Sequence, residues 1–324
     1  MQHTLFDTPL PIVILSKKKE AKVVVEKTSN ISWSFSKMEM LNSCPRKYYY
    51  NYFGKSKRKA KDDDNKEEIA LYSTMSNKHT TVGDIIHICI SRFLGKSKKE
   101  EYWDFSNLKW LANQQINDRI SHTKKLKNSK ETNNTFPISP IKELFDGSMT
   151  ENEFLDFAND KIEQSLSNFY NSEHFEFIKD NASYSDSIIE RKANFKLGNI
   201  TIDGAIDVAF EDGGKFHIVD WKTSYSTYEE TSVQLLVYAL WTIEKFGKDI
   251  EDICIHKAFL LDGNLETLDF SQKHIERAKA KIKQSVEAMI ALEKYGTDGV
   301  IEAFDCCDEP NVCKLCPFEK ICKS

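Results

Sequence analysis

Residues Gly204–Thr223 form the sequence GAIDVAFEDGGKFHIVDWKT, in which apolar side chains alternate with small or polar ones on both sides of a glycine-rich break. Such alternation is typical of strands, and Asp-Gly between two alternating runs favours a two-residue turn. The segment is therefore predicted to be a β-hairpin. The same alternation places Asp207 on one strand, and Asp220 and Lys222 on the other, on a common face.

The register of this hairpin decides whether the two acids meet. A turn at Asp212-Gly213 pairs Glu211 with Gly214 and makes Asp207 and Asp220 diagonal neighbours, whereas a turn one residue longer separates them. Two carboxylates that close repel each other at neutral pH unless a cation lies between them, and their hard oxygens favour Mg²⁺ or Mn²⁺.

Lys222 is predicted to project beside this metal. There its amine could orient or deprotonate an attacking water, or stabilise charge that develops on a phosphate. An isolated D-x-K motif also fits an exposed hairpin whose Asp and Lys form surface ion pairs of little energetic value. The rest of the chain has to decide between these two interpretations.

Six separated segments carry a resemblance. They are Ser34–Tyr50, Val82–His87, Gly204–Asp207, Val219–Thr223, Gln234–Tyr238 and the cysteine-rich tail that ends at Cys322. In this order they resemble the RecB-like branch of the PD-(D/E)XK nuclease superfamily, of the iron-sulfur type found in CRISPR-associated RecB-like exonucleases and the AddB nuclease domain.

The resemblance implies a restriction-endonuclease-like α/β fold, a mixed sheet flanked by helices. We expect residues 31–324 to form a single nuclease domain after an N-terminal extension over 1–30. Within it, residues 100–180 are predicted to be a helical insertion, because apolar side chains recur there at helical spacing. Residues 304–324 together with Cys44 are expected to form an iron-sulfur lid.

His87 lies in a helical pattern over 81–94. Taken alone, it is more typical of a core histidine with satisfied hydrogen bonds. The resemblance implies instead that His87 is a metal ligand, together with Asp207, Asp220 and the backbone carbonyl of Trp221. A glycine one turn earlier, Gly83, is expected to leave room beside the imidazole ring.

Gln234 and Tyr238 are one turn apart on a helix predicted over about 232–246, where they could form a solvated edge. The family's Q-x-x-x-Y motif implies that both lie in the catalytic site with Asp207, Asp220 and Lys222. The strand before the hairpin carries an acid, Glu190, at a position where relatives often have one.

The cysteines predict a second chemical site. Eight occur in the chain, at Cys44, Cys89, Cys254, Cys306, Cys307, Cys313, Cys316 and Cys322. The last three supply thiolates at a spacing typical of metal sites, and a closed site needs a fourth ligand. The resemblance implies that Cys44 is this ligand and that the group is a [4Fe-4S] cluster. The alternatives are structural zinc with Cys306 or Cys307 as fourth ligand, and reduced structural thiols.

Composition places few limits on the substrate. The net charge is −5, so contact with phosphates would depend on local lysine runs such as 55–61, 96–99 and 124–130, which could equally be solvated loops. The short apolar run at 10–15 precedes its lysines, the wrong order for a secretory leader, and no membrane span is predicted. Thiol-rich metal binding without a leader favours the cytoplasm.

The sequence thus predicts a metal-dependent DNA nuclease that hydrolyses phosphodiester bonds. The resemblance implies single-stranded DNA or single-stranded ends as substrate, exonuclease action, and work beside a helicase or another DNA-processing protein in repair, CRISPR adaptation, or phage or defence DNA processing. The alternative is a non-cleaving iron-sulfur subunit that only binds DNA within a larger complex.

Overall fold

The computed structural model describes residues 32–55, 66–99, 101–129, 138–184, 186–226 and 232–323. The predicted N-terminal extension over 1–30 lies outside these ranges, as does most of the lysine run at 55–61. Among the described residues, no helix combines the length and apolar character needed to cross a bilayer.

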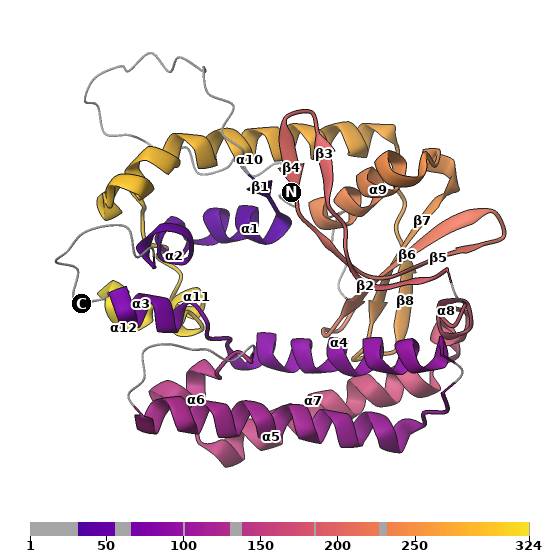
Figure 1. Ribbon diagram of the computed structural model, residues 1–324, viewed down its shortest axis with the longest axis horizontal. Helices are drawn as coiled ribbons and strands as arrows, with labels where there is room; N and C mark the ends of the chain where they lie inside the picture. The colour runs from indigo at the N-terminus through magenta and orange to yellow at the C-terminus, as the bar shows by residue number, and fades with distance from the viewer. Residues whose placement is uncertain are drawn as a thin grey trace.

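A five-stranded mixed sheet lies at the centre of the fold (Figure 1). In spatial order its strands are β2 (Ile188–Lys192), β5 (Ala205–Asp212), β6 (Lys215–Lys222), β7 (Ile253–Phe259) and β8 (Asn264–Thr267). Neighbouring strands are antiparallel except β6 and β7, which are parallel and joined through α9 (Val233–Phe246). The predicted restriction-endonuclease-like α/β class is confirmed.

A smaller mixed sheet joins the start of the domain to the hairpin region. Its order is β1 (Ser32–Trp33), β4 (Ile200–Ile202) and β3 (Phe195–Leu197), with β1 and β4 parallel and β3 and β4 antiparallel. The Trp33 indole donates a hydrogen bond of 2.7 Å to Ser285 Oγ on α10 (Gln272–Asp298), and both residues are buried. This contact fastens the first described residues to a helix far along the chain.

The predicted turn of the central hairpin is wrong by one residue. Asp212 pairs with Lys215, so Gly213 and Gly214 are the two turn residues, with φ of 55° and 80°. A type I′ turn requires positive φ at both positions, which glycine adopts without the steric cost that an aspartate would have. The register moves by two residues, an even number, so the shift by itself turns no side chain to the opposite face.

Helices cover both faces of the central sheet. On the first face, α9 and α10 pack over Ile218 and Ile255, and α1 (Phe35–Ser43) completes the same apolar cluster. On the second face, α4 (Lys78–Ser97) and α7 (Glu151–Asn171) pack over Val219 and Trp221. Burying both faces explains why the neighbours Ile218 and Val219, which point to opposite faces of β6, are both apolar and buried.

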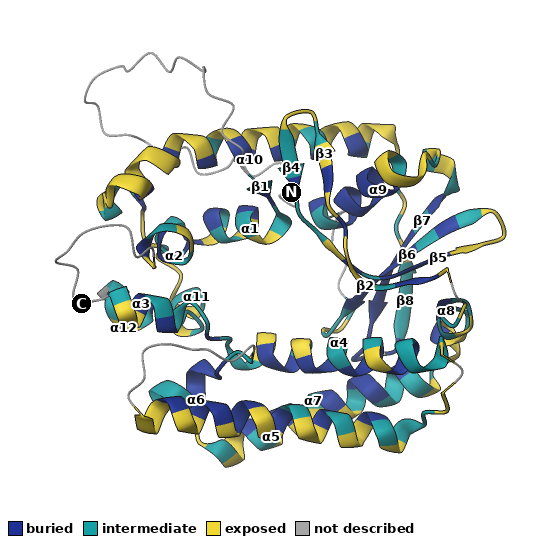
Figure 2. Ribbon diagram, viewed as in Figure 1, coloured by how far each residue is buried: buried dark blue, intermediate teal, exposed yellow. Residues whose placement is uncertain are grey.

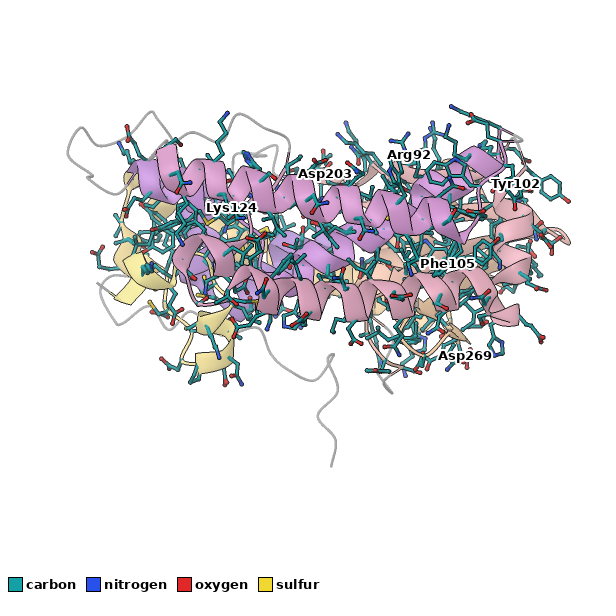
Figure 3. The ribbon with its side chains drawn as sticks, turned by 90° about the horizontal axis from the view of Figure 1, so that it is seen from below. Arg92, Tyr102, Phe105, Lys124, Asp203 and Asp269 are labelled. Carbon is teal, nitrogen blue, oxygen red and sulfur yellow. The ribbon has the colours of Figure 1, made fainter. Side chains whose placement is uncertain are left out.

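The region predicted as a helical insertion is helical. It contains α5 (Phe105–Ser129), α6 (Lys142–Asp146), α7, the short 3₁₀ helix η2 (Glu173–Phe175) and α8 (Glu176–Ala182). Figure 2 shows α5 buried along its inner side and exposed along its outer side, and in Figure 3 Lys124 stands out from this layer. The amphipathic pattern therefore positions α5 as the outer layer beneath α4.

The N-terminal and C-terminal helices meet opposite the central sheet (Figure 1). They are α2 (Pro45–Tyr49), the π-helical turn η1 (Tyr50–Gly54), α3 (Lys66–Tyr72), α11 (Pro310–Lys314) and α12 (Glu319–Lys323), while η3 (Ile250–Asp252) and η4 (Ile301–Ala303) are 3₁₀ turns elsewhere. The Arg46 side chain donates a hydrogen bond of 2.7 Å to the backbone carbonyl of Phe304. The cysteine tail is thereby bound to the start of the domain.

Candidate metal centre

The centre of the site lies where the β5–β6 ladder ends. Val208 pairs with Val219, and one step further the register sets Asp207 opposite Asp220. There the backbone N–H of Trp221 donates a hydrogen bond of 2.9 Å to Asp207 Oδ2. Ile206 packs in the cluster on the first face, whereas Val208 packs on the second, so the alternation of β5 is broken at Asp207. The strands separate at this point, and the carboxylate occupies the space between them.

Helix α4 brings His87 to this point from the second face. Its Nε2 lies 3.2 Å from the carbonyl oxygen of Trp221, and its Nδ1 lies 3.5 Å from Asp207 Oδ1. Gly83 does not leave room beside the ring as predicted. A Cβ at Gly83 would lie 3.3 Å from Thr223 Oγ1, so this glycine permits close approach of α4 to the end of β6.

Glu190 is the residue that the predicted ligand set omitted. Its Oε1 lies 3.9 Å from His87 Nδ1, and ligand atoms of His87, Glu190 and Asp207 all lie within 4.8 Å of one another. Glu190 has φ of 46°, the one positive φ of a non-glycine residue among the described residues. A backbone in this sparsely populated region costs free energy and often marks a functional position. The sequence signal was an acid on the strand that precedes the hairpin.

Asp220 is buried, with 3% of its surface exposed. Its Oδ1 accepts a long hydrogen bond of 3.4 Å from the hydroxyl of Tyr238. Its Oδ2 lies 2.6 Å from Lys222 Nζ as an ion pair, but without hydrogen-bond geometry, and within the described residues it has no hydrogen-bond donor. Burial and the nearby charge of Asp207 raise the pKa of Asp220. A buried carboxylate with an unsatisfied oxygen fits a cation ligand.

Gln234 and Tyr238 join Lys222 to this acid. Lys222 Nζ donates a hydrogen bond of 3.2 Å to Gln234 Oε1, and Gln234 Nε2 donates one of 2.9 Å to the Tyr238 hydroxyl. That hydroxyl in turn donates a hydrogen bond to Asp220 Oδ1. Burial and the charges of the two acids raise the pKa of Tyr238, so the phenol stays protonated and donates. Gln234 is half-buried and Tyr238 buried, so the alternative of a solvated helix edge is wrong.

The electrostatics of the site favour positive charge. Burial disfavours the imidazolium of His87, but the hydrogen bond and charge of Asp207, and the charges of Glu190 and Asp220, raise the pKa of His87 to about 9. Burial and the charge of Asp207 raise the pKa of Glu190 to about 7. A divalent ion held by these residues would supply the positive charge that the acids need, and the neutral ring of His87 would be the form that binds it.

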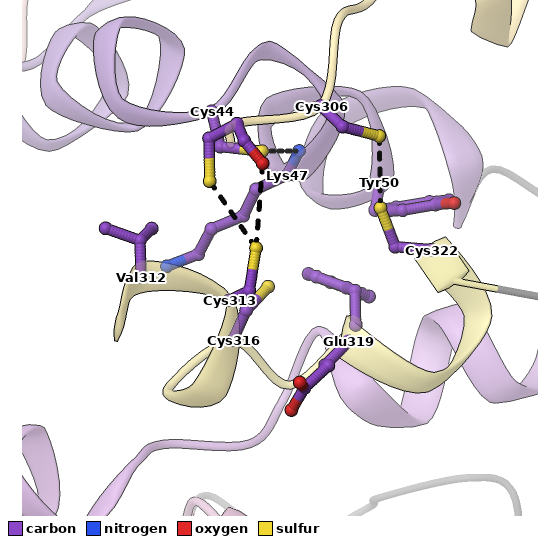
Figure 4. Close-up of a pocket in the computed structure, with 11 residues that line it drawn as sticks. Cys44, Lys47, Tyr50, Cys306, Val312, Cys313, Cys316, Glu319 and Cys322 are labelled. Carbon is purple, nitrogen blue, oxygen red and sulfur yellow. Dashed lines mark hydrogen bonds between the residues drawn. The ribbon is translucent and has the colours of Figure 1, made fainter. Parts of the chain in front are cut away.

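The four cysteines predicted as cluster ligands line one pocket (Figure 4). Cys44 is the N-cap of α2, and its Sγ accepts the N–H of Lys47 at 3.4 Å. Cys306 and Cys307 line the same pocket, whose cavity is about 30 Å³. The donor set fits a thiophilic metal, and its identity stays a prediction.

Comparison with known proteins gives one match. The family model described as "PD-(D/E)XK nuclease superfamily" matches residues 32–323, nearly the whole described domain. No curated protein matches the chain. The matched range contains the residues of the metal centre and those of the cysteine pocket.

Proposed function

The chain belongs to the PD-(D/E)XK nuclease superfamily, and from this membership we propose that it is a metal-dependent deoxyribonuclease that hydrolyses phosphodiester bonds. One observation carries the proposal: His87 meets Asp207 and the Trp221 carbonyl at the open end of the hairpin. Its Nε2 lies 3.2 Å from the carbonyl oxygen, and its Nδ1 lies 3.5 Å from Asp207 Oδ1. Donors of this type suit Mg²⁺ or Mn²⁺.

In the proposed site, the ligands are His87, Asp207, Asp220 and the carbonyl of Trp221, and Glu190 is close enough to join them or to hold a metal-bound water. A bound divalent ion would polarise the phosphate and lower the pKa of a coordinated water. The unsatisfied Oδ2 of Asp220 supports its place in this set, because an ion would relieve both its burial and its repulsion by Asp207.

Lys222 is proposed to position the attacking water or to stabilise charge on the phosphate. The Lys222 side chain is 32% exposed, so the lysine can reach a substrate while its amine is hydrogen-bonded to Gln234. The chain of hydrogen bonds through Gln234 and Tyr238 would keep the amine beside Asp220. Fixing the amine before substrate binds reduces the reorganisation needed during the reaction.

We further propose single-stranded DNA, or DNA with single-stranded ends, as substrate, exonuclease action, a helicase or another DNA-processing partner, and cytoplasmic location. The resemblance to RecB-like nucleases supports these points.

The cysteine pocket is proposed to hold a [4Fe-4S] cluster through Cys44, Cys313, Cys316 and Cys322, with zinc as alternative. Iron and zinc analysis, with absorbance near about 400 nm for a cluster, distinguishes the two.

The alternative, a non-cleaving DNA-binding subunit, is disfavoured because Asp207, Asp220 and Lys222 are all present and joined by contacts. Lys222→Ala tests the proposal on end-labelled single- and double-stranded DNA with and without Mg²⁺ or Mn²⁺. The variant should cleave at least about a hundredfold more slowly, with an unchanged circular dichroism spectrum. Product sizes over time separate exonuclease from endonuclease action.

The matched control is Lys215→Ala, at the other end of the same strand, where the lysine pairs with Asp252 at the surface. A surface pair contributes little, so this variant should cleave at the wild-type rate. Cleavage by the Lys222 variant at the same rate as this control, or wild-type cleavage without any divalent ion, would refute the proposed site.

A further inference from the structure

The cysteine pocket holds more thiols than the proposed metal needs. Four cysteines form the proposed ligand set, and Cys306 and Cys307 line the same pocket. Cys306 contacts one proposed ligand, and Cys307 contacts two. Cys306 Sγ lies 3.3 Å from Cys322 Sγ, and Cys307 Sγ lies 3.6 Å from Cys313 Sγ and also accepts a hydrogen bond from the Cys44 thiol. The additional thiols therefore contact three of the four proposed ligands, and Figure 4 shows the contact of Cys306 with Cys322.

The two sulfur atoms of each pair are already in contact, 3.3 and 3.6 Å apart. A disulfide needs a sulfur separation of about 2.05 Å, so the sulfurs of each pair have to approach by less than about 2 Å. The paired residues are 16 and 6 positions apart in the sequence. Residues 305–309 have no regular secondary structure, so their backbone can adjust without breaking a helix or strand.

The cysteines of the pocket differ in how far solvent reaches them. Cys306 is exposed, whereas Cys307, Cys313 and Cys322 are partly buried and Cys44 is buried. An oxidant in solvent therefore meets Cys306 first, with Cys322 in contact behind it. Redox-sensitive cysteines are accessible thiols of low pKa with a second thiol within reach. Burial and the contact with Cys306 raise the pKa of Cys322 to about 12, so the exposed Cys306 is the thiol that meets the oxidant and Cys322 the one that completes the disulfide.

We infer that Cys306 is an oxidation site which, when the pocket holds no metal, forms a disulfide with Cys322, and that Cys307 does the same with Cys313. With hydrogen peroxide as oxidant, the Cys306 sulfur attacks one peroxide oxygen and the O–O bond breaks, leaving a sulfenic acid and water. The Cys322 sulfur then attacks the sulfenic sulfur, the S–O bond breaks, and a second water leaves with the remaining proton.

Forming these disulfides would prevent the pocket from binding metal. The two disulfides would consume Cys313 and Cys322, leaving Cys44 and Cys316 of the proposed ligands, and two thiols cannot close a four-ligand site. The oxidised chain would be unable to take up metal until a reductant restores the thiols. This consequence rests on the proposed ligand set, whereas the pairing itself rests only on the distances.

The pairing is tested on the full-length wild-type chain. Metal is removed by a chelator without oxygen, about one equivalent of hydrogen peroxide is added, free thiols are alkylated, and the disulfides are mapped by peptide mass spectrometry. Cys306–Cys322 should be the main product, followed by Cys307–Cys313 with more peroxide. A main product of Cys313–Cys316, or any main product containing Cys44, overturns the inference. The map does not depend on nuclease activity.

The consequence is tested with zinc as the probe metal. The oxidised wild-type chain should bind at least about tenfold less zinc than the reduced chain and recover after dithiothreitol. Cys306→Ser/Cys307→Ser should bind zinc normally when reduced and keep that capacity after peroxide. If the reduced double variant, with a wild-type circular dichroism spectrum, fails to bind zinc, the two cysteines are ligands themselves and the inference is wrong.

Discussion

Replacing Asp220 by Asn should make the metal-free protein more stable and abolish its stabilisation by metal. Asp220 is buried, its Oδ2 has no hydrogen-bond donor within the described residues, and Asp207 repels its charge. Asn keeps the acceptor for the Tyr238 hydroxyl but carries no charge to desolvate. The lost ion pair costs little, because Lys222 is 32% exposed and also donates to Gln234.

The size of the effect follows from these contacts. Burial and the repulsion by Asp207 outweigh the attraction of Lys222 at this carboxylate, and because an incompletely satisfied buried group costs about 1–3 kcal/mol, we expect a stabilisation of about 1–2 kcal/mol. Unfolding entropy of roughly 0.7 kcal/mol/K for 324 residues converts this to a rise in Tm of about 2 °C.

Added metal should stabilise the wild type but not the Asp220→Asn variant. Manganese at a hundred times its Kd stabilises a folded protein by about 2.7 kcal/mol, which corresponds to a Tm rise of about 4 °C in the wild type. The variant lacks one of the proposed ligands and should show no rise at the same concentration. The order of stability of the two proteins therefore reverses when manganese is added.

The assay is thermal unfolding followed by circular dichroism, with EDTA or with manganese. Asp269→Asn is the matched control, because this acid is exposed in the loop after β8 (Figure 3) and its replacement should change neither measurement. The reasoning fails if the Asp220 variant is less stable than the wild type in EDTA, or if manganese stabilises it as much as it stabilises the wild type.

Three further outcomes are expected. Glu190→Gln should weaken manganese affinity about tenfold, measured by tryptophan fluorescence, and an unchanged Kd would remove Glu190 from the site. His256 stacks on His217, and burial and the charge of that neighbour lower its pKa to about 4. The unfolded chain alone takes up this proton as pH falls from about 6.5 to 4, so stability falls over that range. Between pH 7 and 5 the wild type should lose about 2 kcal/mol more than His256→Gln in urea unfolding, and equal losses would contradict this. Gly296→Ala would set a Cβ 2.5 Å from the Phe53 ring, so it should lower stability by about 1–3 kcal/mol, and an unchanged Tm would show that the ring moves freely.

Local patterns in the sequence were sufficient for the hairpin and the helices. The reason is that alternation with a period of two, or of three to four residues, reports directly which side of a strand or helix is buried. The family match over 32–323 confirms the superfamily that the separated motifs indicated. The RecB-like branch and the iron-sulfur group stay predictions.

The turn shows where local patterns fail. Asp212-Gly213 and Gly213-Gly214 are both good turn dipeptides, and the difference in free energy between them is small. The pairing of β5 with β6, and of β6 with β7, decides the register in favour of the second. A register error of an even number of residues leaves the faces unchanged, so only the break in alternation at Asp207, between Ile206 and Val208, departs from the predicted faces.

Two features came only from the tertiary structure. Glu190 lies 103 positions from His87 in the sequence, and their approach depends on how α4 packs against the strained edge of β2. Cys306 and Cys307 had been considered only as alternative zinc ligands, whereas their contacts pair them with Cys322 and Cys313. No repeat or spacing in a linear chain encodes such distances, because they arise when separate elements pack together.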